Sequence, residues 1–223
     1  MAKQNVINRA TQDLTIDSGA SGDSFIQFAI NGTGEFRIGV DDDASDAFKV
    51  SQGGALGADD TFVMSAVGER TMPLQSAFLA YLGAYDNDVT GKDIIYTLGS
   101  RTAMTEMYDQ NNDFNVNGTF TAPVTGRYWL SVFLRTSATG FDGGMTYGCL
   151  TLITSNRNYC RYWNPYGTQA LGSGVSINVD VIADMDATDT AIVTLEVTGG
   201  AANTLRIYGG TTVQSFFAGI LLA

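Results

Sequence analysis

The segment Arg157–Gly167, RNYCRYWNPYG, holds the densest group of side chains able to recognise a ligand. It combines four aromatic rings with two arginines, two asparagines and a proline. Rigid aromatic rings beside polar donors suit the binding of glycans or protein surfaces, because they offer contact area at little cost in side-chain entropy. This pattern predicts a ligand-binding site whose candidate residues are Arg161, Tyr162, Trp163, Asn164 and Tyr166.

The same rings have a second interpretation as core or interface residues. We favour that interpretation for Tyr159 and leave both open for the other three aromatics. Pro165 stiffens the segment, which lies between two predicted strands, so we expect Tyr162–Tyr166 to form a projecting loop. In a chain with an acidic surface, Arg157 and Arg161 would be local positive points for an anionic sugar.

Catalytic patterns are weak. The sequence contains no histidine, which excludes Ser–His and Cys–His nucleophile systems and His-ligated zinc. The segment GGALGADD lacks the lysine of a phosphate-binding loop. Paired carboxylates alone could support glycoside hydrolysis, but glutamates are few and most aspartates lie in turn contexts. We predict that the protein is not an enzyme and has no cofactor.

Two acidic segments could bind a hard cation such as Ca²⁺, which requires several oxygen ligands. One is Asp41–Asp46, DDDASD, and the other contains Asp184, Asp186 and Asp189. Neither has the spacing and glycine of an EF-hand loop. We favour solvated turns and predict no metal site, with Ca²⁺ as the alternative.

Composition limits the partners. The 223 residues carry a net charge of −11, which repels nucleic acid and anionic membranes. No apolar run is long enough to span a membrane, and the first residues, MAKQNVINRATQD, lack the apolar segment of a secretory signal. These features predict synthesis and folding in a reducing cytoplasm.

The two cysteines flank a predicted hairpin, CLTLIT-SNRN-YCRYW. With a four-residue turn at Ser155–Asn158, Cys160 would lie opposite Ile153 and not opposite Cys149. We therefore favour two buried free thiols, with a disulfide as the alternative.

The stretch Phe120–Leu134, FTAPVTGRYWLSVFL, reads as a turn followed by a long strand. Pro123 and Gly126 mark the turn, and apolar residues then alternate with period two from Tyr128 onward. Because both faces are largely apolar, we expect a central strand covered on both sides.

The first 72 residues contain a quasi-repeat in which Phe25, Phe36, Phe48 and Phe62 each precede a short β-like run and a turn. The spacings fit a β-meander. Phe36 shares a face with Ile38, and the corresponding pairs follow in the next two runs. A single thin sheet has nothing to bury its apolar face against, so it needs a second layer from the rest of the chain or from other copies.

The segment Arg70–Gln75 is the predicted linker, because Pro73 disfavours regular structure where the repeat ends. After it follow ten or so strand-like runs with no convincing helix, ending in SFFAGILLA. Such a series predicts a sandwich or jelly roll. We predict two domains, 1–72 and 73–223.

The first domain resembles the strand-rich stalk units of bacteriophage tail fibres and tail spikes. The resemblance covers the stretch GEFRIGVDDDASDAFKVSQGGALGADDTFVMSAVGE, about forty residues, and implies a trimeric stalk. The matching residues are Phe36, Gly39, Val40, Asp41, Asp46, Phe48, Lys49, Val50, Ser51, Leu56 and Gly57.

The second domain resembles the C1q/TNF-like jelly roll. Its order of motifs is matched by an opening Ala-Phe-x-Ala strand, a Tyr–Asp step, Phe-x-Ala-Pro-x-x-Gly-x-Tyr, and a final Phe-Phe-x-Gly strand. Departures include Leu130 and Val132 in place of aromatics and Thr188 in place of glycine. The resemblance implies a compact trimer packed through apolar strand faces, with loops at the tip for ligands. It also marks structural residues: Phe120, Pro123, Gly126, Tyr128, Phe217 and Gly219.

Together these observations predict an all-β homotrimer with an N-terminal β-meander stalk and a C1q/TNF-like head. We expect a bacteriophage virion protein, made in the host cytoplasm, whose head binds a host-surface glycan or protein. Its N-terminal region would attach to other virion proteins. The alternative function is a capsid decoration or head fibre with a display or stabilising role; a cellular C1q-like lectin is the weaker third.

Overall fold

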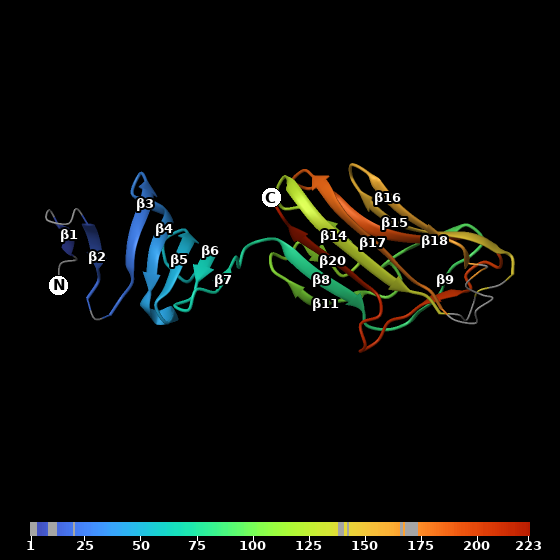
Figure 1. Ribbon diagram of the computed structural model, residues 1–223. Coiled ribbons are helices and arrows are strands. Elements are labelled where there is room, and N and C mark those ends of the chain that lie inside the picture. The colour runs from blue at the N-terminus through green and yellow to red at the C-terminus, as the bar shows by residue number, and fades with distance from the viewer. Residues whose placement is uncertain are drawn as a thin grey trace. The chain divides into compact units, whose positions relative to one another are not determined.

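The computed structural model describes residues 4–8, 13–19, 21–137, 141, 143–165, 167 and 174–223. The chain divides into two compact units, Met1–Gln75 (unit 1) and Ser76–Ala223 (unit 2). Both are built from β-strands (Figure 1). Among the residues that the structure describes, no helix is long and apolar enough to cross a membrane.

Unit 1 contains a hairpin and a five-stranded antiparallel meander whose strands pair in sequence order. A 3-10 turn, η1 (Asp42–Ala44), joins β4 to β5. The hairpin strands are β1 (Gln4–Asn8) and β2 (Asp13–Asp17), and the meander strands are β3 (Ser24–Ile30), β4 (Thr33–Asp41), β5 (Ala47–Gln52), β6 (Asp60–Met64) and β7 (Arg70–Thr71).

Apolar side chains cover one face of the meander. The register places Ile38 beside Ile26 and Val50, and Phe48 beside Val40 and Met64. The expected pairs of residues on one face are therefore present. We call this surface the apolar meander face: Ile26, Phe28, Phe36, Ile38, Val40, Phe48, Val50, Phe62 and Met64.

The opposite face of the meander holds a buried ion-pair group. Lys49 Nζ lies 2.8 Å from a carboxylate oxygen of Asp41 and 2.8 Å from one of Asp60. Asp60 also accepts hydrogen bonds from the Ser51 hydroxyl and from the Gly57 N–H. The expectation that Asp41 belongs to a solvated turn is wrong, because its side chain is buried against Lys49.

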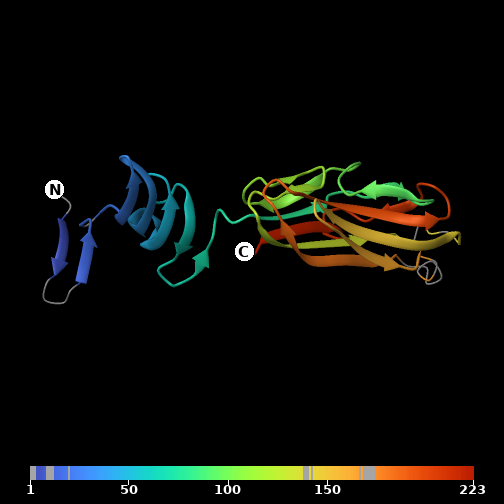
Figure 2. The same cartoon turned by 90° about the horizontal axis from the view of Figure 1, so that it is seen from above.

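Unit 2 is a sandwich of two antiparallel sheets (Figures 1 and 2). One sheet has the order β11-β8-β20-β14-β17, formed by β11 (Met104–Asp109), β8 (Ala77–Leu82), β20 (Phe216–Leu221), β14 (Gly126–Arg135) and β17 (Ser176–Met185). The other has the order β12-β13-β18-β15-β16, with β10 also paired to β18; its strands are β12 (Phe114–Asn115), β13 (Thr119–Thr121), β18 (Thr190–Gly199), β15 (Met145–Thr154), β16 (Asn158–Trp163) and β10 (Ile94–Thr97). A small pair joins β19 (Leu205–Ile207) to β9 (Asp86–Thr90).

In each sheet, strands distant in sequence are neighbours, as a jelly roll requires. The fold-class prediction, all-β with a C-terminal jelly-roll sandwich, is confirmed. The central-strand prediction is also confirmed, because β14 pairs with β20 on one side and β17 on the other. Its core-facing residues are fully buried: Tyr128, Leu130, Val132 and Leu134.

The other face of β14 does not fit the expectation that both sides are covered. Trp129 is 42% exposed, beside Ile182 and Ile220 on the two neighbouring strands. Phe133 stacks on Phe216, with the ring centroids 5.8 Å apart. The outer side of this sheet is therefore largely apolar, and no further layer covers it among the described residues of unit 2.

The predicted structural residues divide between the core and the ends of strands. Phe120 and Phe217 pack around Phe78, and Gly219 lies opposite both Phe78 and Leu130. A Cβ on Gly219 would lie 2.5 Å from the Phe78 ring, so the glycine makes room for that ring. The Tyr128 hydroxyl donates a 2.7 Å hydrogen bond to the Val124 carbonyl.

Pro123 is exposed in the connection before β14, as expected of a turn residue. The turn position predicted for Gly126 is wrong, because this residue begins β14 and its φ is not left-handed. Its constraint is instead a close approach: a Cβ would lie 2.7 Å from the Ala223 carbonyl oxygen.

Candidate functional site

Strand β16 carries most of the predicted ligand-binding residues and lies at the edge of its sheet. Tyr162 and Trp163 belong to this strand, so the prediction that they form part of a projecting loop is wrong. Because side chains alternate along a strand, Arg161 and Trp163 share one face and Tyr162 points to the other. The strand therefore separates the predicted residues onto two faces.

Tyr162 lies on the outer face, where it is 65% exposed. Its ring is 5.8 Å from that of Tyr147 on the adjacent β15. Cys149 is directly opposite Tyr162 in the strand register. Of the predicted residues, Tyr162 is therefore accessible to solvent on this face, beside Tyr147, which is not one of the predicted residues.

Trp163 is half-buried and packs against the core of unit 2. It lies opposite Gly148, where a Cβ would be 2.3 Å from the indole ring. Tyr159 is also partly buried against the core, in agreement with its predicted role. Asn164 is exposed beyond the end of β16, whereas Tyr166 lies outside the described residues.

Arg161 lines a groove at the open edge of the sandwich, between β16 and β17. The groove has a volume of about 470 Å³ and its lining residues are Tyr159, Cys160, Arg161, Asn178, Val179, Asp180 and Val181. A phenol ring, a guanidinium, an amide and a carboxylate thus border one opening. These groups can stack against and hydrogen-bond to a polar ligand such as a sugar.

Sequence reasoning missed Asn178 and Asp180 in this groove. Both lie on β17, and the Asn178 amide donates a hydrogen bond to Asp180, which also accepts one from the Ser131 hydroxyl. The available signal was the alternation of polar and apolar residues in SINVDVIADM, which places both on the outer face. Only the folded chain shows that this strand lies beside β16.

Arg157 does not join Arg161 in one positive patch. It lies at the other end of β16, and its guanidinium contacts the Asp184 carboxylate at 3.3 Å. Hydrogen bonds from Arg157 lower the pKa of Asp184, in a pair whose side chains are both exposed. The expected action of the two arginines on one anionic sugar therefore has no geometric basis.

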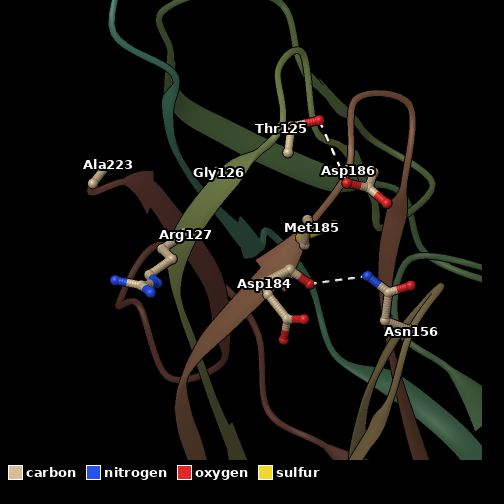
Figure 3. Close-up of a pocket in the computed structure, with 8 residues that line it drawn as sticks. All are labelled: Thr125, Gly126, Arg127, Asn156, Asp184, Met185, Asp186 and Ala223. Carbon is tan, nitrogen blue, oxygen red and sulfur yellow. Dashed lines mark hydrogen bonds between the residues drawn. The ribbon is translucent and has the colours of Figure 1, made fainter.

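A second pocket, of about 360 Å³, lies at the end of the sandwich that holds the C-terminal residue Ala223 (Figure 3). Asp186 accepts a hydrogen bond from Thr125, and the Asn156 amide donates to the Asp184 carbonyl (Figure 3). Asp189 accepts from the Asp186 N–H and from Asn156. Asp186 and Asp189 thus lie in the β17–β18 turn, as the turn interpretation expects, whereas Asp184 belongs to β17 and its carboxylate pairs with Arg157.

A group of carboxylates lies close together in unit 1. Oxygen atoms of Asp23, Asp41 and Asp42 are within 4.8 Å of one another. Burial, together with the neighbouring carboxylates, raises the pKa of Asp23. Asp41 is already paired with Lys49, so this cluster offers a cation fewer free oxygens than its residue count indicates.

The outer side of the β11-β8-β20-β14-β17 sheet is an apolar surface that extends over adjacent strands. The register aligns Trp129 with Ile182 and Ile220, and Phe133 with Phe216 and then Tyr81. Asp180, opposite Ser131, is a charged residue within this surface. We call it the apolar head face: Leu79, Tyr81, Trp129, Phe133, Ile182, Phe216 and Ile220.

Comparison with known proteins gives structural likenesses alone. No protein-family model matches the sequence, and no curated protein matches it. The globular domain of zebrafish complement 1qA is 16% identical and has a TM-score of 0.39, with 67% of this chain and 98% of that chain covered. Eiger TNF from S. frugiperda is 12% identical with a TM-score of 0.42, covering 67% and 93%.

PRD1 vertex protein P5 is 8% identical, with a TM-score of 0.49 and coverage of 77% of this chain and 87% of that chain. Identities and scores this low carry no information on function. The jelly-roll assignment of unit 2 rests on its own strand order and register.

Proposed function

We propose that this chain is a fibre-type structural protein of a bacteriophage virion that assembles as a homotrimer. Unit 1 would form the stalk that attaches to other virion proteins, and unit 2 the head that binds a host-surface receptor or glycan. The observation that carries the proposal is that each unit has an apolar sheet face that no other described element of the same unit covers. The sequence resemblance of unit 1 to phage stalk units supports the virion assignment.

The apolar meander face favours other copies of this chain as its cover. Its side chains from β3 to β6 are apolar except for Ser24 and Gln52, and the charged residue that the register adds is Arg70, at the β7 edge. Phe28 is 57% exposed and Phe36 is 46% exposed. A meander of one layer cannot bury these rings by itself, whereas three copies can provide a shared core.

The apolar head face supports the same assembly. Its aromatic residues lie on the outer side of the β11-β8-β20-β14-β17 sheet, whereas Tyr162 lies on the outer side of the other sheet. A stable interface requires burial of about 1,000 Å² or more with good packing. We expect each contact between protomers to exceed this area.

Light scattering on the full chain tests the assembly. We expect one species of three chains at micromolar concentration. Ile38→Asp places a charge in the middle of the apolar meander face, and Trp129→Asp does so on the apolar head face; both variants should dissociate or aggregate. Ile95→Asp is the matched control, because Ile95 is 62% exposed on the other head sheet. A stable, folded wild-type monomer would refute the trimer.

Binding of the full chain to host cells tests the receptor role. Arg161→Ala and Tyr162→Ala should each weaken binding, with Ile95→Ala as the control that leaves it unchanged. If both variants remain trimeric and bind as the wild type does, the site lies elsewhere. Immunogold labelling of the virion distinguishes receptor binding from the alternative role in capsid decoration. Label on the capsid surface, together with no binding to host cells, would favour decoration.

A further inference from the structure

The outer face of the β15–β16 pair brings two thiols together. Cys149 lies opposite Tyr162 and Cys160 opposite Thr151, so the cysteines are diagonal neighbours on one face. The Thr151 hydroxyl oxygen is 3.2 Å from Cys149 Sγ and 3.5 Å from Cys160 Sγ. Both thiols are free in this structure.

This arrangement corrects the expected register. The turn is shorter than Ser155–Asn158, since Asn158 already pairs with Ile153 at the start of β16. Cys160 therefore moves from the expected position opposite Ile153 to the position opposite Thr151, two residues closer to Cys149. The expectation of two buried thiols is also wrong, because Cys160 is exposed.

The two thiols differ in accessibility. Cys149 is 7% exposed, and burial raises the pKa of its thiol above the ordinary value. Glu196 lies opposite Cys149 on β18, Tyr162 and its ring neighbour Tyr147 lie beside the pair, and Asp180 lines the same groove as Cys160. An external reagent will therefore meet Cys160 first, with Cys149 held behind it as a second thiol.

We propose that Cys149 and Cys160 form an oxidisable pair that a small-molecule disulfide closes into a bridge between β15 and β16. The Cys160 thiolate attacks one sulfur of the reagent, forms a mixed disulfide and releases one thiolate. The Cys149 thiolate then attacks the Cys160 sulfur and releases the second thiolate. The protein loses two electrons and two protons, which the reagent takes up as it becomes two thiols, so the exchange is balanced.

A diagonal pair begins farther apart than a directly opposed pair, so the bridge requires a small shift of one strand. Strand β16 can make this shift because, among the described strands, it is hydrogen-bonded to β15 alone. Closing the bridge would fix the edge strand that carries Arg161 and Tyr162. If the groove binds a ligand as proposed above, oxidation would also rigidify one wall of it, since Cys160 lines that groove.

The experiment treats the native full chain with oxidised glutathione and follows free thiols and intact mass. We expect both thiols to disappear together, the mass to fall by two hydrogens, and non-reducing peptide mapping to join Cys149 to Cys160. Cys149→Ser should stop at a stable glutathione adduct on Cys160. Cys160→Ser should react slowly, because the remaining thiol is buried.

The bridged wild type should melt about 5 °C higher than the reduced protein, whereas the Cys149→Ser adduct should not. A glutathione adduct that persists on wild-type Cys160, or a link between Cys160 residues of two chains, would overturn the proposal. Neither result depends on ligand binding, so the thiol pair and the receptor role can fail independently.

Discussion

Units 1 and 2 are built from antiparallel sheets of similar width, but they differ in what covers the apolar side. In unit 2 the core face of β14 is fully buried by the second sheet, and Phe78 stacks between Phe114 and Phe120. In unit 1, no second layer covers the equivalent apolar face among the described residues, and Phe28 and Phe36 remain about half exposed. Similar strand patterns therefore produce one self-contained core and one incomplete core.

The two units accordingly obtain their stability from different sources. Burial of apolar area is the main favourable term in folding, and unit 2 obtains it within one chain. Within one chain, unit 1 is stabilised mainly by the backbone hydrogen bonds between its strands and by the Lys49 ion pairs on the face opposite the apolar meander face. The stability of unit 1 should thus depend on protein concentration, whereas that of unit 2 should depend on it less.

The largest effect is expected from opening the core of unit 2. Phe78→Ala removes a ring that contacts Phe114, Phe120 and Phe217, and should reduce the free energy of unfolding by about 3–5 kcal/mol. Denaturant unfolding at two protein concentrations measures it, with the exposed-site variant Ile95→Ala as control. A loss below about 1 kcal/mol, close to the range of surface changes, would contradict the self-contained core.

In unit 1, the corresponding test removes the buried cation. Lys49→Met leaves the carboxylates of Asp41 and Asp60 buried without their partner and should cost about 3 kcal/mol. The matched control adds Asp41→Asn and Asp60→Asn, which removes the unpaired charges and should recover much of the loss. Equal melting of Lys49→Met and wild type would show that the ion pairs are not needed for this sheet.

The same group predicts a pH dependence for unit 1. Burial alone would raise the pKa of Asp60, but hydrogen bonds from Lys49, Ser51 and Gly57 lower it below 3.8. This stabilisation is present above the unfolded value near 3.8 and is lost as pH falls through the folded pKa.

For Lys49, burial alone would lower the pKa, but the two carboxylates raise it above 10.5. Its contribution is therefore complete below 10.5 and lost as pH rises through the folded pKa. The melting temperature of unit 1, measured from acid to alkaline pH, should fall at both ends of the range for the wild type. It should fall at neither end for the triple variant Lys49→Met, Asp41→Asn, Asp60→Asn.

Two glycines in unit 2 should differ in their tolerance of a side chain. Gly219→Val pushes a Cβ against the buried rings and methyls of Phe78 and Leu130, and should cost about 1–3 kcal/mol. Gly126→Val meets the exposed Ala223 backbone and the end of the half-buried Leu221 side chain, which lie outside the fully buried core, so a loss of about 1 kcal/mol is expected. A larger loss for Gly126→Val than for Gly219→Val would contradict the placement of Gly219 in the core and of Gly126 at its periphery.

The smallest effect is expected from a single hydroxyl. Tyr128→Phe keeps the buried ring but removes the hydrogen bond to the Val124 carbonyl, at a cost of about 1 kcal/mol. Thermal melting should show this loss at every protein concentration, since the bond lies within one chain. A concentration-dependent loss would place Tyr128 in the assembly contacts of the head.

The alternation of residues along the chain determined much of the fold. Period two from Tyr128 to Leu134 predicted β14 and its buried face, and the shared-face pairs Phe36 with Ile38 and Phe48 with Val50 are present in the meander. Backbone geometry imposes this alternation locally, so adjacent residues are enough to reveal it. The absence of histidine likewise excluded His-based chemistry by composition alone.

Only the tertiary structure determined which residues pack against each face of a strand. Period two shows that Trp129 and Phe133 share a face, but not that this face stays exposed in the described part of the chain. The turn between β15 and β16 is shorter than expected, so Cys160 lies opposite Thr151. Contacts between strands distant in sequence pair Arg157 with Asp184 and place Arg161 beside β17. Strand register and layer packing depend on contacts between residues far apart in the chain, which a local pattern does not contain.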